Sequence, residues 1–188
     1  GDRLRGSWTG VSALTDAAAL VVPLRDALVL VRQEHLQSEP QDATNRETLH
    51  AVVADGAEIP YPPATSNFHH EIELVVALGE AALDVAEAAA LDCVYGYSVG
   101  VDLTRRDLQK VARDMGRPWD CGKAFDNSAP LTAIVPASVV GHPERSPIWL
   151  SVNGEMRQEG NIDQMIWSVP EVIATLSRQF HLKPGDLI

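Results

Sequence analysis

The chain has 188 residues, 45% of them hydrophobic and 22% charged, which is enough for one globular domain with a core. Its formal net charge of −11 and its pI near 4.8 argue against nucleic acid as the main partner, because no run of Lys and Arg offsets the acidic surplus. Charged residues or prolines interrupt each apolar stretch well short of a membrane span, and Ala17–Pro23 lacks the flanks of a cleavable signal peptide.

The first fifty residues carry weak patterns, in which Asp16–Leu20 and Leu24–Val31 could each form a short helix or a strand. The pattern then becomes clearer. Ala51–Val53 is predicted to be a short strand that ends at the turn pair Asp55-Gly56. The prolines within Ile59–Pro63 require extended backbone, because each proline keeps the residue before it out of the helical region.

The next three elements are predicted from their composition. A run of apolar and β-branched residues that begins near His69 and ends at Gly79 indicates a strand. The alanine-rich segment Ala81–Leu91 predicts a helix. Val94–Val101 predicts a second strand, with Asp102 at its C-terminal end.

Thr104-Arg105-Arg106-Asp107 resembles a capping box, and apolar residues at helical spacing follow it up to Gly116, so we expect a helix there. Ile148–Val152 and Glu155–Gln158 flank Asn153-Gly154, which predicts a β-hairpin.

Ser168 as N-cap and Glu171 three residues later predict a last helix that ends near Phe180. Pro184-Gly185-Asp186 predicts a turn, and Leu187-Ile188 the start of a strand. This order of elements indicates an α+β protein of mixed strands and scattered helices, without a βαβ alternation.

Two carboxylates stand out within the first long strand. Glu71 and Glu73 are two residues apart, so their side chains share one face of that strand. Like charges on a half-buried face repel each other and lose hydration, and a hard divalent cation between them would offset both costs. The alternative is an edge strand whose polar face is solvated. Asp102 could add a third oxygen ligand for Mg²⁺, or it could cap the helix that follows.

Basic and amide side chains follow the acidic residues along the chain. Arg106 and Gln109 are three residues apart and therefore share one helix face, where Arg106 could bind a substrate carboxylate or merely pair with surface acids. Lys123 lies in a glycine-flanked segment and could be functional or solvated. His69 could hydrogen-bond to the acidic residues without binding the metal itself, although a core or capping role is commoner for a histidine. Cys93 and Cys121 fit no metal spacing, which predicts reduced structural thiols in a cytoplasmic protein.

Several motifs together resemble the fumarylacetoacetate hydrolase family. The motifs, in chain order, are His69-His70-Glu71-Ile72-Glu73, Tyr95–Gln109, Gly116–Asp120, Gly122–Asp126, Val152–Glu155, Arg157-Gln158 and Pro184–Ile188. The resemblance covers roughly residues 51–188. The residues of these motifs are most similar to those of bacterial enzymes that cleave acylpyruvates such as fumarylpyruvate.

The resemblance implies a mixed β-roll or sandwich-like fold and a homodimer. It also implies Mg²⁺ or Mn²⁺ bound by Glu71, Glu73 and Asp102, and a 2-oxo acid substrate bound by Arg106, Gln109 and Lys123. Residues 51–188 would then form the metal-binding catalytic part of a single domain, and residues 1–50 a divergent N-terminal lid. We expect neither nucleic acid nor a membrane as a partner.

The chain departs from the family pattern in two places. The family has an Asn-Tyr-x-x-His-x-x-Glu segment whose His and Glu activate water. In this chain no Asn-Tyr pair precedes His35, and Glu39 follows His35 by four residues instead of three. The family also continues beyond Leu187-Ile188 with a Thr-Gly-Thr-Pro loop and closing strands, so we expect a C-terminally incomplete version of the fold.

Three hypotheses follow from the resemblance and its departures. The first is a hydrolase of the acylpyruvate C–C bond, with Lys123, Gln109 and a displaced base, His35, as catalytic residues. The second is a related chemistry on the same metal site, either β-keto-acid decarboxylation or enol–keto isomerisation. The third is a truncated, inactive metal-binding protein.

Overall fold

The computed structural model describes residues 51–188. The predictions for Asp16–Leu20, Leu24–Val31 and His35 lie outside the described residues. Within the described part, the chain is α+β as expected, with short helices around two sheets. No helix in this part is long and apolar enough to cross a membrane.

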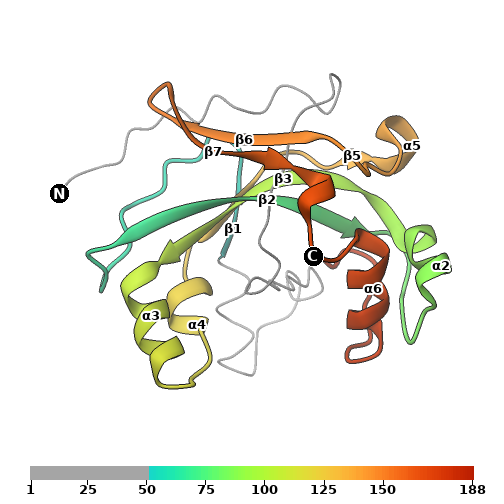
Figure 1. Ribbon diagram of the computed structural model, residues 1–188, viewed down its shortest axis with the longest axis horizontal. Helices are drawn as coiled ribbons and strands as arrows, with labels where there is room; N and C mark the ends of the chain where they lie inside the picture. The colour runs from blue at the N-terminus through green and yellow to red at the C-terminus, as the bar shows by residue number, and fades with distance from the viewer. Residues whose placement is uncertain (1–50) are drawn as a thin grey trace.

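The main sheet has five strands and is built around one long antiparallel pair. In spatial order its strands are β1 (Val52–Ala54), β4 (Ala129–Leu131), β3 (Val94–Arg105) and β2 (Phe68–Leu78), and β5 (Val135–Pro136) also pairs with β3. A second sheet is the hairpin of β6 (Pro147–Val152) and β7 (Glu155–Asn161). The hairpin lies along one side of the main sheet (Figure 1).

Short helices lie at both ends of the β2–β3 pair. In Figure 1, α3 (Arg106–Asp114) and α4 (Asp120–Lys123) lie at one end, and α2 (Glu87–Ala90) and α6 (Val169–Ser177) at the other. The 3-10 turns η2 (Leu91–Cys93) and η3 (Ile162–Gln164) and the helix α5 (Ala137–Val140) complete the described elements. The two long strands therefore connect the two groups of helices.

The two faces of β2 have different neighbours, as its alternating sequence predicts. Ile72 packs with Ile148, Leu150 and Ile162, so the hairpin and η3 cover its face. Glu71 and Glu73 point to the other face, because successive side chains of a strand alternate. One face of β2 is therefore buried against the hairpin, and the opposite face carries the two carboxylates.

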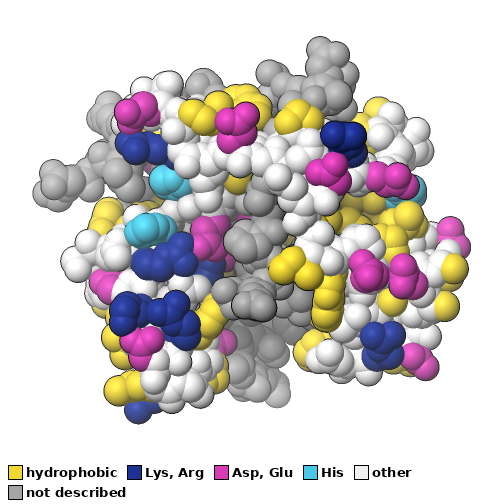
Figure 2. Space-filling view, in the orientation of Figure 1, with side chains coloured by type: hydrophobic (Ala, Val, Ile, Leu, Met, Phe, Trp, Pro, Cys, Tyr) yellow, Lys and Arg dark blue, Asp and Glu magenta, His cyan; other side chains and the backbone are white. Residues whose placement is uncertain are grey.

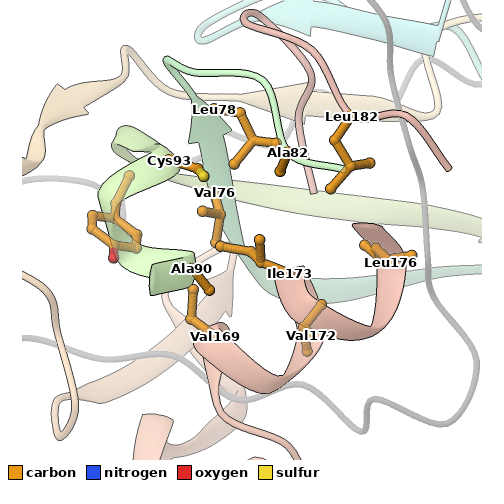
Figure 3. Close-up of a cluster of buried hydrophobic side chains, with 11 residues drawn as sticks. Val76, Leu78, Ala82, Ala90, Cys93, Val169, Val172, Ile173, Leu176 and Leu182 are labelled. Carbon is orange, nitrogen blue, oxygen red and sulfur yellow. The ribbon is translucent and has the colours of Figure 1, made fainter. Parts of the chain in front are cut away.

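The larger core cluster lies at the α6 end of the strands. Val172 and Ile173 of α6 belong to the same buried cluster as Val76 and Leu78 of β2, and Figure 3 shows Ile173 beside Val76. Ile173 is fully buried. This end of the fold stabilises the β2–β3 pair by burial of apolar surface, and the opposite end remains available for polar groups.

The predicted helix over Ala81–Leu91 is wrong for most of its length. Only Glu87–Ala90 is α-helical, and the 3-10 turn η2 follows. Ala82 instead pairs with Leu182 through both of its backbone groups, each at 3.0 Å, and Asp84 has a positive φ of 50°. Tertiary hydrogen bonds therefore override the helix propensity of the alanines.

The helix after β3 is confirmed, but its predicted start is not. Thr104 lies within β3, and the residue that caps α3 is Arg105, whose side chain makes no capping hydrogen bond. Asp107 instead accepts hydrogen bonds from Thr65 Oγ1 at 2.6 Å and from Ser66 N at 2.9 Å. The aspartate thus ties a distant loop to the first turn of α3.

The C-terminal elements follow the sequence closely. The β6–β7 hairpin turns at Asn153-Gly154, both with positive φ. Ser168 and Glu171 form a reciprocal capping box, and α6 ends at Ser177, three residues before the predicted end. Ile188 exchanges two backbone hydrogen bonds with Val76, so the chain does begin to pair with β2 after the Pro184–Asp186 turn.

Candidate metal and substrate site

The antiparallel register brings three carboxylates together. Glu71 lies directly opposite Asp102, and Glu73 lies opposite Gly100, so all three side chains share one face of the β2–β3 pair. One carboxylate oxygen from each lies within 4.8 Å of the others. Asp102 does not end its strand as predicted, because β3 continues to Arg105 and keeps the aspartate inside a paired, buried segment.

Gly100 leaves room beside these carboxylates. A Cβ built at this position would lie 2.8 Å from Cγ2 of Val75, which is closer than real Cβ contacts. A larger residue here would push Val75 away from the strand pair next to Glu73. The glycine in the Tyr95–Gln109 motif therefore has a packing role at the edge of the cluster.

Two cationic side chains reach the carboxylates from α3 and α4. Lys123 Nζ donates to Glu71 Oε2 at 2.6 Å and also to Asp102 Oδ2. Arg106 forms an ion pair with Glu71 Oε1 and donates to Gln109 Oε1 at 2.7 Å. Arg106 therefore pairs with the cluster instead of with surface acids.

Lys123 is not solvated, which excludes the simpler of its two interpretations. Its side chain is only 8% exposed. The segment that carries it packs tightly on α3, because a Cβ at Gly122 would lie 3.0 Å from Cβ and N of Gln109. The glycine before Lys123 thus permits a close approach that directs the lysine toward β2 and β3.

Burial dominates the electrostatics of the two inner carboxylates. Burial, together with the neighbouring Asp102 and Glu71 charges, raises the pKa of Glu73 to about 8. Burial also raises the pKa of Asp102 to about 6, although Lys123 opposes this shift. Burial is the largest cause of both shifts, and a pKa of about 8 leaves the Glu73 carboxyl mostly protonated at neutral pH in the metal-free protein.

Glu71 and Lys123 shift in the directions that their ion pair favours. Burial works to raise the pKa of Glu71, but hydrogen bonds and charge from Lys123 and Arg106 outweigh it and hold this pKa below its ordinary value. Burial would lower the pKa of Lys123, yet Asp102 and Glu71 raise it overall. Both groups are therefore charged at neutral pH.

Basic residues gather near one end of the cluster despite the acidic composition of the chain. Figure 2 shows Lys and Arg side chains over α3, the helix that carries Arg106, Lys110 and Arg113. A local positive potential of this kind attracts anionic small molecules. The opposite side of the cluster is apolar: Glu73, Asp102 and Lys123 line a cavity of about 100 Å³ whose walls include Val75, Leu131 and residues of α6.

The structure separates the remaining sequence candidates from this cluster. His69 is exposed, and its ring nitrogen hydrogen-bonds with Asn67 Oδ1 at 2.8 Å, so no contact with the carboxylates supports a role there. Cys93 is buried and Cys121 exposed, and both are free thiols.

Sequence reasoning missed Thr104 as a neighbour of the cluster. Thr104 is fully buried and donates to Asp102 Oδ1 at 3.5 Å. Its position two residues after Asp102 on a strand places it on the same face, and this spacing was the available signal. The capping-box pattern placed Thr104 at the start of a helix, so this strand spacing was not applied to it.

Comparison with known proteins shows the same family over most of the chain. Residues 29–188 match the family described as fumarylacetoacetate (FAA) hydrolase, C-terminal. A fumarylpyruvate hydrolase from Ralstonia sp is 50% identical over 137 residues, which cover 73% of this chain and 71% of the relative. A mitochondrial oxaloacetate tautomerase from Oryza sativa subsp. japonica is 43% identical over 140 residues, covering 74% of this chain and 62% of the relative.

A solved structure agrees with this result. The fumarylpyruvate hydrolase from Pseudomonas aeruginosa, solved in complex with Mn²⁺ and pyruvate, superposes with a TM-score of 0.72 at 53% identity. The match covers 73% of this chain and 61% of that one, so the present chain spans less than two thirds of the length of the solved protein. The extent of the family match and the identity of the relatives lead to one conclusion: the chain belongs to the fumarylacetoacetate hydrolase family.

Proposed function

We propose that this chain is a metal-dependent hydrolase that cleaves the C–C bond of an acylpyruvate, of the fumarylpyruvate type, into pyruvate and a carboxylic acid. The observation that carries the proposal is the convergence of three carboxylates with a buried lysine and an arginine on one strand pair. The 50% identity with a fumarylpyruvate hydrolase supports this choice of substrate class.

The proposed cofactor is Mg²⁺ or Mn²⁺, held by Glu71, Glu73 and Asp102. The residues fit such an ion for two reasons. Their oxygens are hard ligands within 4.8 Å of one another, and a bound cation would offset the repulsion between the three carboxylates once all are deprotonated. When bound, the ion would supply Lewis-acid stabilisation of the developing negative charge on the substrate.

The protein groups around the cluster have complementary roles in the proposed reaction. The Arg106 guanidinium donates to Gln109 and pairs with Glu71, and its remaining N–H groups would bind the carboxylate of a 2-oxo acid. The Lys123 ammonium would donate hydrogen bonds to the oxygen of the pyruvate enolate, where negative charge develops.

The proposed chemistry is a hydrolytic C–C cleavage. Water adds to the acyl carbonyl, the C–C bond breaks, and its electron pair leaves on the pyruvate enolate, which is then protonated on carbon. His35, which lies outside the described residues, remains our candidate for the base that activates the water. A cytoplasmic homodimer is the proposed state of the protein.

Oxaloacetate tautomerisation is the second candidate function, because tautomerases of this family are 43% identical to the chain. An enol–keto exchange needs the stabilised enolate but no activated water, so it could proceed without His35. Decarboxylation of oxaloacetate would use the same stabilisation. These reactions differ from acylpyruvate hydrolysis in product, and an assay can separate them.

The test is a parallel assay of the purified protein on fumarylpyruvate and on oxaloacetate, each with EDTA and with added Mg²⁺ or Mn²⁺. We expect metal-dependent release of pyruvate and fumarate from fumarylpyruvate. Metal-dependent conversion of oxaloacetate alone would favour the second function. Metal binding without turnover of either substrate would support an inactive protein.

Metal affinity should increase as the pH rises from 6 to 8. A metal can bind only deprotonated carboxylates, and burial raises the pKa of Asp102 to about 6 and that of Glu73 to about 8. Titration calorimetry with Mn²⁺ at pH 6, 7 and 8 measures the dependence, and two buffers of different ionisation enthalpy report the released protons. An affinity that stays constant over this range would contradict the assignment of Glu73 as a ligand.

A further inference from the structure

We propose that Arg105 is the positioning residue for Lys123: its guanidinium holds the segment 121–125 against the strand pair that carries Glu71 and Asp102. This inference rests on the proposed function in one respect, namely that Lys123 takes part in the reaction. The contacts themselves, and the test below, do not depend on enzyme activity.

Arg105 contacts the chain on both sides of Lys123. Its guanidinium carbon lies 4.2 Å from the ring centroid of Phe125, two residues after the lysine. Its Nη1 donates to the carbonyl oxygen of Cys121, two residues before the lysine, at 3.4 Å. One side chain therefore spans the short segment from which the ammonium reaches the carboxylates.

The ring that Arg105 covers is itself fixed to the same strands. Phe125 is 6% exposed, and its ring centroid lies 6.2 Å from that of Phe68. Phe68 is the cross-strand partner of Arg105, at the end of the β2–β3 pair. Phe125 thus packs over a phenylalanine from β2 and under an arginine from β3, so its position is tied to the register that also sets Glu71 opposite Asp102.

Among residues 51–188, the contact with the Phe125 ring is the main interaction of Arg105. Its Nε is buried and has no hydrogen-bond partner among residues 51–188, and the single bond from Nη1 is long. Within the described part of the chain, the cation–π contact with Phe125 therefore holds this guanidinium more than hydrogen bonds do. A lysine could supply the charge over the ring, so Arg105→Lys should keep most of the effect.

Other contacts keep the backbone of the segment in place without Arg105. Gly122 packs against Gln109, and Gly122 N and Lys123 N donate to Trp119 O at 2.7 Å and 3.0 Å. Loss of the Arg105 side chain should therefore leave the fold intact and loosen only the segment 121–125, with Lys123 at its centre.

The test is ¹⁵N NMR of lysine ammonium groups in the metal-free protein. The chain contains three lysines, Lys110, Lys123 and Lys183, so the spectrum is simple and loss of a signal in Lys123→Met assigns it. A buried ammonium held by two carboxylates exchanges slowly with water. Arg105→Met should speed the exchange of Lys123 about tenfold, the size expected for one desolvated cation–π contact, and Arg105→Lys should restore most of it.

Two variants separate positioning from a general loss of stability. Arg113→Met, on the exposed part of the neighbouring helix α3, should leave the Lys123 signal unchanged. Phe125→Leu removes the ring but keeps an apolar side chain, and it should speed the exchange of Lys123 as Arg105→Met does. It provides the test if Arg105→Met folds poorly. An unchanged Lys123 signal in folded Arg105→Met or Phe125→Leu would overturn the proposal, and so would the absence of a slowly exchanging Lys123 signal in the parent protein.

Discussion

Glu73→Gln should remove the stabilisation by Mg²⁺ or Mn²⁺ and, at the same time, stabilise the metal-free protein at pH 8. The two effects have opposite signs because Glu73 is costly without a metal and useful with one. Its carboxylate is buried beside Asp102 and Glu71, and this environment raises its pKa to about 8. Glutamine has nearly the same shape but no charge to bury.

The pH dependence of the metal-free protein follows from the same shift. Folding raises the pKa of Glu73 from an ordinary value of 4.5 to about 8, so the folded state binds its proton more tightly. This contribution to stability is fully present below pH 4.5 and is lost as the pH rises through 8. We expect Glu73→Gln to recover about 1–2 kcal/mol of unfolding free energy at pH 8, after allowance for coupling to its neighbours.

Thermal unfolding with EDTA and with excess metal measures both effects. A ligand at a hundred times its dissociation constant stabilises the folded state by about 2.7 kcal/mol, and the variant should lose most of this gain. Glu80→Gln, an exposed acid just after β2, is the control and should behave like the parent protein. A variant that keeps the full metal-dependent shift would show that Glu73 is not a ligand.

Lys123→Met should have the largest effect on catalysis, and it should strengthen metal binding. The ammonium is the buried donor closest to the carboxylates, and removal of one donor to a developing oxyanion typically costs a factor of about 10²–10³ in kcat. Lys123 also occupies oxygens of Glu71 and Asp102 that a metal would need. Its removal should therefore tighten Mn²⁺ binding, by about tenfold for a charge this close.

Calorimetric titration with Mn²⁺ and steady-state kinetics on fumarylpyruvate measure the two expectations independently. Lys110→Met provides a matched control, because this lysine pairs with Asp114 on the surface of α3 and is 65% exposed. Weaker Mn²⁺ binding in Lys123→Met, with Lys110→Met unchanged, would contradict a competing role for the lysine.

The sequence predicted the polar cluster well because strand geometry is local. The alternation of side chains on β2 placed Glu71 and Glu73 on one face, and the family motifs identified Asp102, Arg106 and Lys123 as their neighbours. Register cannot be read from one strand alone, so the direct pairing of Glu71 with Asp102 became visible only in the structure. The roles of these residues remain proposals.

Errors in the sequence reading occurred where long-range contacts replace local preferences. The alanines of 81–91 have high helix propensity, yet Ala82 pairs with Leu182 a hundred residues later in the chain, and no local pattern signals that partner. Thr104-Arg105-Arg106-Asp107 has the residue types of a capping box, but the strand continues through Thr104 because it pairs with His69. In both cases a hydrogen-bond partner distant in sequence decided the local structure.

A crystal of the protein soaked with Mn²⁺ and measured at a wavelength where manganese scatters anomalously would test the central claim most directly. We expect one strong anomalous peak, at about 2.1 Å from one oxygen each of Glu71, Glu73 and Asp102. The Lys123 ammonium should have moved off at least one of those oxygens. A fully soaked crystal with no peak between the three carboxylates, or with manganese bound elsewhere, would contradict the account.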